Sequence, residues 1–281
     1  MTNKKTISNN SSGIQANGNV NLNVGLTFDQ VEKLTTFFLK ENFPKLREDA
    51  MKLAHENVQK LLNEFKKQLE EKIFTINLNN FSDPDVQNSI NDAVLETAKR
   101  GNKANLDILV DLIFKRVQQT NNDLQSLTAS EAIKIISRLN TGQINYLSIM
   151  VLFHHMSLKT CANLNNFDLT CSKLLPILKN VNKINGWDIQ YLESQRCLVH
   201  LFIGHENIIK QLKEKYTGLK DKTEAVLQQE IENSTYFKDF IAIYEKHKMN
   251  FTRLSIIGQL IGAINIAKYL PQSIDFDNYI K

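Results

Sequence analysis

The stretch that decides the fold is Leu46–Ile73, which reads LREDAMKLAHENVQKLLNEFKKQLEEKI. Its apolar residues recur mostly every three or four positions, and its other faces carry Glu, Lys, Gln and Asn. This spacing predicts one amphipathic helix of about 30 residues, about 45 Å long. Such a stripe is either the spine of a helical body or a coiled-coil seam between subunits, and the pattern leaves both readings open.

A second apolar stripe lies just upstream of this helix. Thr27, followed three residues later by Gln30, is a capping-box signal for a helix start. Pro44 lies between the two stripes and is expected to interrupt or kink the helix. Residues 27–80 are therefore predicted to hold a long kinked helix. The upstream stripe consists of Phe28, Val31, Leu34, Phe37 and Phe38.

The segment before this helix, residues 14–26, reads IQANGNVNLNVGL and alternates apolar and amide residues. Side chains alternate across a strand, so the pattern predicts a short β element with one apolar and one amide face. Asn17-Gly18 is a two-residue turn signal that could close a small hairpin within the chain. Alternatively, identical strands pair between copies, with their amides stacked as ladders. We expect pairing between copies and treat residues 1–26 as a polar leader and oligomerisation segment. The residues expected to make the contact are Ile14, Val20, Asn21, Leu22, Asn23 and Val24.

The remainder, residues 81–281, is predicted to be a multi-helix body, so the expected fold class is mainly α. Only 10 glycines and 4 prolines interrupt the 281 residues, which favours helices over turns. Asp83-Pro84 should start one helix and Gly101 should end it. Leu106–Val117 reads as a central, buried helix. Further helices are expected after a capping box at Thr128 and Glu131, and over Thr141–Met156, Trp187–Phe202 and Thr252–Leu270.

Composition argues against several function classes. The net charge of +4 is far from that of a dedicated nucleic-acid binder. Met1–Ser12 has no apolar run of the kind found in a secretory signal, and three cysteines are an odd number without a disulfide framework. These features fit a reducing cytoplasm.

Few residues suggest chemistry. Cys197, His200 and His205 are the only grouping with some resemblance to a zinc site, on the expectation that Cys197 and His200 share a helix face. A fourth ligand is missing, so we expect Cys197 to pack as a small hydrophobic residue. Phosphate-binding glycine loops and hydrolase motifs are absent from the sequence. We therefore expect no metal, no cofactor and no catalytic residues.

Two stretches admit a functional and a structural reading. Leu254–Leu270 is mostly apolar, and the spacing of Gly258 and Gly262 allows close helix packing. It could act on a membrane, but it is at the short limit for a span, and a core helix is the preferred reading. The densest lysine region, residues 210–222, lacks interleaved aromatic residues, so a solvated face is preferred there over nucleic-acid binding.

The opening residues Ile14–Leu22, followed by Val24-Gly25-Leu26-Thr27-Phe28, resemble the start of an uncharacterised bacterial family known by locus-tag names. Phe81-x-Asp83-Pro84-Asp85 and Leu254-Ser255-x-x-Gly258-x-x-Ile261 are similar to later blocks, although the family favours Thr where this chain has Ser255. The resemblance implies an α-helical cytoplasmic protein. By analogy, such leader segments imply a role in anti-phage defence, and the family offers no catalytic residues to transfer.

We therefore expect a non-enzymatic, homo-oligomeric interaction, sensor or adaptor protein that binds itself and another protein. The alternatives are a membrane-acting effector using residues 254–270, and a nucleic-acid binder or hydrolase using the lysine-rich surface.

Overall fold

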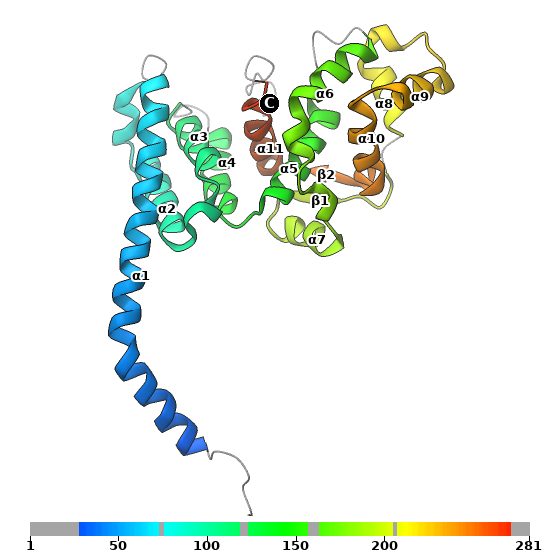
Figure 1. Cartoon of the computed structure of the whole chain (residues 1–281). Coiled ribbons are helices and arrows are strands. Elements are labelled where there is room, and N and C mark those ends of the chain that lie inside the picture. Colours follow the sequence, from blue (N-terminus) through cyan, green and yellow to red (C-terminus); the bar gives the residue numbers. More distant parts are fainter. Residues whose placement is uncertain (1–27, 73–75, 119–122, 157–162, 205–206, 271–281) are drawn as a thin grey trace, which may run out of the picture. The chain divides into compact units, whose positions relative to one another are not determined.

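The computed structural model describes residues 28–72, 76–118, 123–156, 163–204 and 207–270, with side chains from residue 47 onward (Figure 1). The chain divides into two units, residues 1–51 and 52–281, and helix α1 (Phe28–Lys72) belongs partly to each. The other α-helices are α2 (Pro84–Arg100), α3 (Leu106–Gln118), α4 (Asp123–Ile136), α5 (Thr141–Met150), α6 (Leu164–Leu178), α7 (Gly186–Ser194), α8 (Ile208–Lys215), α9 (Glu224–Asn233), α10 (Phe237–Lys246) and α11 (Ile256–Ala267).

The described part of the chain is mainly α-helical, as predicted. Short 3₁₀ turns join several helices, among them η1 (Leu78–Ser82) and η2 (Gly101–Ala104), and a π-helical turn, η3 (Val151–His155), extends α5. Two short strands, β1 (Leu198–His200) and β2 (Thr252–Leu254), pair antiparallel, with Val199 opposite Arg253. The expected N-terminal strand lies outside the described residues.

Capping residues define α2 as predicted. The Asp83 side chain accepts hydrogen bonds from the backbone N–H groups of Asp85 and Val86, and Pro84 occupies the first helical position. At the other end, Gly101 has φ +56°, a conformation that glycine adopts at little cost. A β-carbon at Gly101 would also lie 2.5 Å from Asn57 Oδ1 on α1, so the Asn57 side chain would have to shift to admit a larger residue.

Helix α1 continues through Pro44, so the proline does not interrupt it, and the alternative expectation of a kink within one long helix stays a prediction. Three other sequence expectations are corrected. Thr128 does not cap a helix, because α4 has already begun by Asp123 and the Thr128 hydroxyl donates to the Leu124 carbonyl inside it. The helices predicted over Trp187–Phe202 and Thr252–Leu270 are shorter than expected. Part of the first range forms strand β1, and part of the second forms strand β2.

The backbone explains both shortenings. Helix α7 stops at Ser194, and Arg196 adopts φ +58°, which turns the chain into β1. Helix α11 begins only after Ser255, whose hydroxyl accepts from the Gly258 N–H as an N-cap. The Ser255 N–H also donates to the Cys197 carbonyl, which ties the start of α11 to β1.

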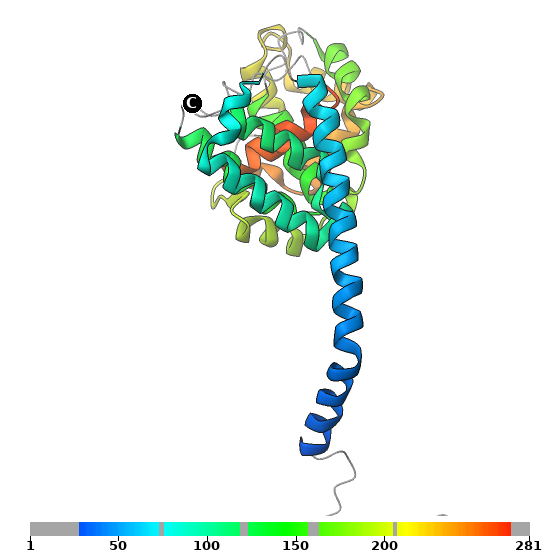
Figure 2. The same ribbon diagram turned by 90° about the vertical axis from the view of Figure 1, so that its left-hand side faces the viewer.

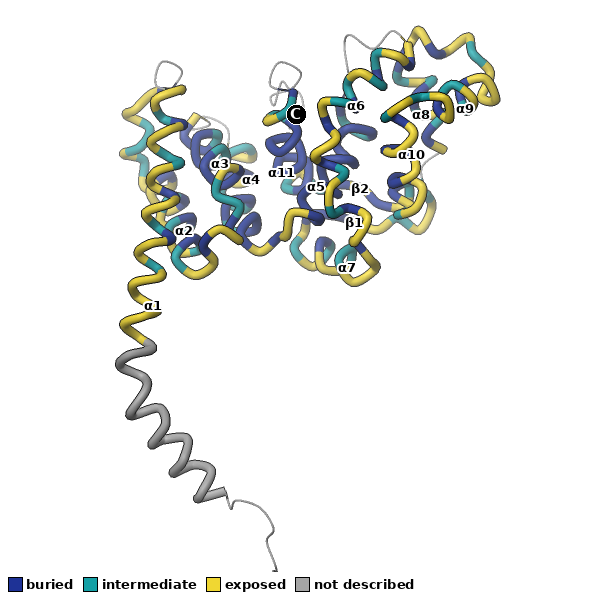
Figure 3. Tube along the Cα trace, viewed as in Figure 1, coloured by how far each residue is buried: buried dark blue, intermediate teal, exposed yellow. Residues whose placement is uncertain are grey.

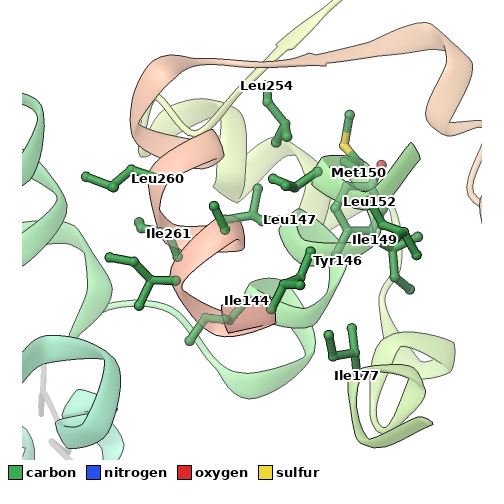
Figure 4. Close-up of a cluster of buried hydrophobic side chains, with 14 of the residues drawn as sticks. Ile144, Tyr146, Leu147, Ile149, Met150, Leu152, Ile177, Leu254, Leu260 and Ile261 are labelled. Carbon is green, nitrogen blue, oxygen red and sulfur yellow. The ribbon is translucent and has the colours of Figure 1, made fainter. Parts of the chain in front are cut away.

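Helix α11 is at the centre of the second unit. It packs against α3, α4 and α5, and every residue from Gly258 to Ile266 is buried (Figure 3). Figure 4 shows Ile144 and Leu147 of α5 together with Leu260 and Ile261 of α11 in one cluster of buried hydrophobic side chains. The helix predicted to be buried, residues 106–117, does form core together with residues 132–139 and 144–153, and α11 is the element that joins these three segments.

The two glycines of α11 each lie against the backbone of a neighbouring segment. A β-carbon at Gly258 would lie 2.2 Å from the Cys197 carbonyl oxygen, and one at Gly262 would lie 2.7 Å from the Leu147 carbonyl oxygen. The polar residue Asn265 is satisfied inside the core, because its amide donates to Asn145 Oδ1 and Ser148 Oγ at 3.0 and 2.9 Å. The preferred reading of this stretch as a core helix with closely approaching neighbours is thus confirmed.

Candidate interaction surface on helix α1

Three polar side chains attach the C-terminal part of α1, which belongs to the second unit, to other helices of that unit. Asn57 donates to the Ala98 carbonyl of α2 at 3.2 Å, and Gln68 donates to the Asp107 carbonyl of α3 at 3.4 Å. Lys72 pairs with Asp111 at 2.5 Å and lies 5.0 Å from the centre of the Phe114 ring. Leu61, which lies between Asn57 and Gln68 on α1, is buried. This part of α1 is therefore a spine of the body (Figure 2).

Aromatic packing supports the same attachment. The Phe65 ring stacks on Phe114 of α3 with centroids 4.9 Å apart, and it meets Phe81 of η1 edge-on at 6.0 Å. Such pairs add specificity of orientation to ordinary apolar burial.

An apolar groove runs beside this spine. It has a volume of about 330 Å³, and every side chain lining it is apolar. Two of these side chains remain well exposed, Leu62 at 42% and Leu78 at 52%. The groove is lined by Leu61, Leu62, Phe65, Leu69, Leu78, Phe81, Ile90, Val94 and Ile113.

The apolar face of α1 extends beyond the part that the body covers. Leu53 lies just over two turns before Leu61, at the edge of the same apolar stripe, because residues eight apart on a helix are separated by about 80° around its axis. Leu61 is 3% exposed, whereas Leu53 is 58% exposed. All residues from Arg47 to Leu53 are exposed (Figure 3). The stripe is thus a spine near Leu61 and an uncovered surface at Leu53.

A family model with a locus-tag-style "-like" name matches residues 25–231. The chain belongs to this family. The matched residues include all of α1 and the Phe81–Asp85 block, while the residues predicted to make oligomer contacts, between Ile14 and Val24, precede them. No curated protein and no solved structure matches the chain.

The predicted oligomerisation residues, Ile14, Val20, Asn21, Leu22, Asn23 and Val24, lie outside the described residues. The groove and the exposed Leu53 were not recognised in the sequence. A stripe with a period of 3.6 looks the same whether or not another helix covers it, so the pattern of α1 alone could not show where coverage ends.

The weak zinc grouping is corrected, because its premise of a shared helix face is wrong. Cys197 precedes β1 and is buried, and burial raises the pKa of its thiol to about 12. His200 ends β1 with an exposed side chain, and its Nδ1 lies 3.9 Å from a Glu193 carboxylate oxygen. His205 lies outside the described residues, within which no three His, Cys, Asp or Glu side chains gather as a metal site would need.

The lysine-rich region is partly neutralised within the chain. Lys222 pairs with Glu230 at 2.6 Å, and Lys215 donates to the Phe153 carbonyl at 3.0 Å. Burial lowers the pKa of Lys215 to about 8. This region is therefore not a continuous row of solvated cations.

In the part of the chain that the structure describes, no helix combines the length and the apolar character needed to cross a membrane. Helix α11, the candidate for that role, has 12 residues.

Proposed function

We propose that this chain is a non-enzymatic, homo-oligomeric interaction protein of the bacterial cytoplasm, acting as an adaptor or sensor. The observation that carries the proposal is the exposure of Leu53 at the edge of the apolar stripe that buries Leu61. An apolar stripe that continues past its covering elements marks an interaction site.

The occupant that we propose is a second copy of the same chain. The upstream stripe Phe28–Phe38 provides further apolar residues at helical spacing. The groove beside Leu62 has only apolar lining, so a helix with an apolar face complements it. Because each copy carries both surfaces, self-association needs no further component. Segment 14–26 is proposed to add strand pairing between copies.

Point variants test the surface. Leu53→Asp and Leu62→Asp each place a charge in the proposed contact and should lower the mass in solution, measured by light scattering coupled to size exclusion. Leu169→Asp on α6 is the matched control, because Leu169 is 64% exposed and lies on another helix. The control should keep the parent's mass. Equal masses for all four chains would contradict the proposal.

The biological setting that we propose is a defence or conflict system, with another protein bound by the assembled chain. Support for this part comes from the resemblance of the leader segment alone. The test is the plating efficiency of phages on bacteria that express the parent chain or Leu53→Asp. We expect protection by the parent and its loss in the variant at equal protein level. Equal plating with and without the parent chain, across a panel of phages, would contradict this setting.

A further inference from the structure

A second concave surface lies in the unit 52–281, away from the groove. It has a volume of about 820 Å³, within the range of ordinary ligand sites. Its walls come from the α2–η2 junction, the end of α4 and the first turns of α5 and α7. The charged and aromatic residues that line the cleft are Arg100, Lys103, Arg138, Trp187, Asp188 and Tyr191.

Hydrogen bonds fix these walls to one another. Asn105, with φ +54°, donates through its amide to the carbonyls of Ile136 and Leu139, both at 2.9 Å. This joins the η2 turn to the end of α4. Gln143 of α5 donates to Asp188 of α7 at 3.0 Å. The cleft is therefore preformed, which reduces the entropy lost when a ligand binds.

The charge of the cleft is positive. Arg100, Lys103 and Arg138 are exposed, and none of them lies within ion-pair distance of a carboxylate that the structure describes, although Arg138 interacts electrostatically with Glu96. Asp188 is the one carboxylate that lines the cleft, and it accepts hydrogen bonds from the Gln143 amide and the Asn185 N–H. The two helix starts are capped by Asn140 and Asn185, so anion binding here depends on the three cationic side chains.

The cleft also offers aromatic faces. Trp187 is the only tryptophan of the chain and is 81% exposed. Tyr191 lies one turn later on the same face of α7, and its hydroxyl donates to the Arg138 carbonyl at 3.4 Å. Tryptophan rarely stays so exposed without a role, since it brings a large apolar surface into water.

We propose that this cleft binds a nucleotide unit, with the base stacked on Trp187 and the phosphate held by Arg100, Lys103 and Arg138. Flat aromatic faces beside unpaired cations are what binding of a base and its phosphate requires. The unit could belong to a free nucleotide or to a single-stranded nucleic acid. This site is independent of the self-association surface and carries no implication for it.

The single tryptophan makes the test direct. ATP and a short thymidine oligonucleotide are titrated into the full chain while Trp187 fluorescence is recorded. We expect saturable quenching that weakens as salt is raised. Quenching by ATP alone identifies a free nucleotide, and quenching by the oligonucleotide alone, or far more tightly by it, identifies a strand. Quenching by neither probe would overturn the proposal.

Variants show whether the quenching comes from this cleft. Arg138→Ala and Arg100→Ala should each weaken binding about tenfold, the usual effect of losing one charge-assisted hydrogen bond. The control is Arg253→Ala, an exposed arginine on β2 outside the cleft, which should leave the affinity unchanged. Helix content is checked by circular dichroism. Equal affinities in all four chains would place binding elsewhere and overturn the assignment.

Discussion

Gly262 shows how a single position allows two helices of the core to approach. A β-carbon there would lie 2.7 Å from the Leu147 carbonyl oxygen and 2.8 Å from its carbonyl carbon. Both atoms belong to the α5 backbone, so no side chain can rotate away to make room. A larger residue at Gly262 must therefore push α11 and α5 apart.

We predict that Gly262→Ala lowers the free energy of unfolding by about 1–3 kcal/mol, the usual cost of overpacking a core. Gly186→Ala is the control, since a β-carbon at Gly186 meets no atom within 4 Å. The control should be neutral or slightly stabilising, because alanine favours helix over glycine. Urea titrations of both variants beside the parent measure the difference. A Gly262→Ala midpoint equal to that of Gly186→Ala would contradict the packing described for α11.

Leu109 tests the core from another helix. Its side chain on α3 is fully buried. Leu109→Asp would place an unpaired charge among apolar neighbours, at a cost on the order of several kcal/mol. We expect a large drop in melting temperature, followed by circular dichroism. An unchanged melting temperature would mean that this face of α3 is not buried in solution.

At the scale of elements, one helix start depends on a side chain from a different helix. Asp168 of α6 accepts from the backbone N–H groups of Tyr236 and Phe237 at 2.6 and 2.8 Å, and from that of Thr235 at 3.2 Å. Tyr236 is the N-cap residue of α10 and makes no capping hydrogen bond with its own side chain. Burial raises the pKa of Asp168, but these three hydrogen bonds, together with the positive charge of Lys238, hold the pKa below its ordinary value.

Asp168→Ala should cost about 0.5–2 kcal/mol at neutral pH, as the loss of a helix cap does. Because the folded state lowers the pKa, the stabilisation is present above the ordinary pKa of an aspartate and is lost as pH falls through the folded value. The stability gap between parent and variant should therefore narrow in acid. Denaturant titrations over that pH range measure it, and a gap that stays constant would argue against the cap.

The accuracy of the sequence predictions differed between elements for physical reasons. Asp83-Pro84 and Gly101 defined α2 because capping is local, and the spacing within Leu106–Val117 defined a core helix. The strands were missed because the apolar run through Leu198 looks like part of a helix, and its partner strand lies far away in sequence. Arg196, with φ +58°, gave no warning of the turn, since arginine has no preference for that conformation.

The candidate sites were the hardest part to predict. The groove beside α1 and the cleft around Trp187 each combine side chains from several helices that are distant in sequence. The sequence spacing of Arg100 and Arg138 does not predict that they line one cleft. They do so because, in the folded chain, the Asn105 amide joins the turn after Arg100 to the segment that contains Arg138. Conversely, the Cys197 and His200 grouping depended on a helix that the structure replaces with a strand.

At the scale of the whole molecule, a core built around α11 lies beside a helix, α1, whose apolar face is only partly covered. Leu61 is buried and Leu53, at the edge of the same apolar stripe of α1, is exposed, so we expect the full chain to associate with itself. Because the proposed contact is apolar, the association should persist at high salt, unlike one held by exposed ion pairs.

The variant Leu22→Asp tests whether segment 14–26 contributes to the association between copies. Each copy would bring a like charge to the proposed strand contact, and burying Leu22 there would otherwise contribute about 1.5–3 kcal/mol per chain. We expect a lower mass with unchanged helix content. A local hairpin predicts a different result, some loss of stability without any loss of mass.

The most direct measurement is sedimentation equilibrium of the unmodified full chain over a range of protein concentrations, at low and high salt. We predict a mass that is a multiple of the single chain at both salt concentrations. A chain that sediments as a monomer at every concentration would contradict the proposal that the exposed face of α1 joins copies of this protein.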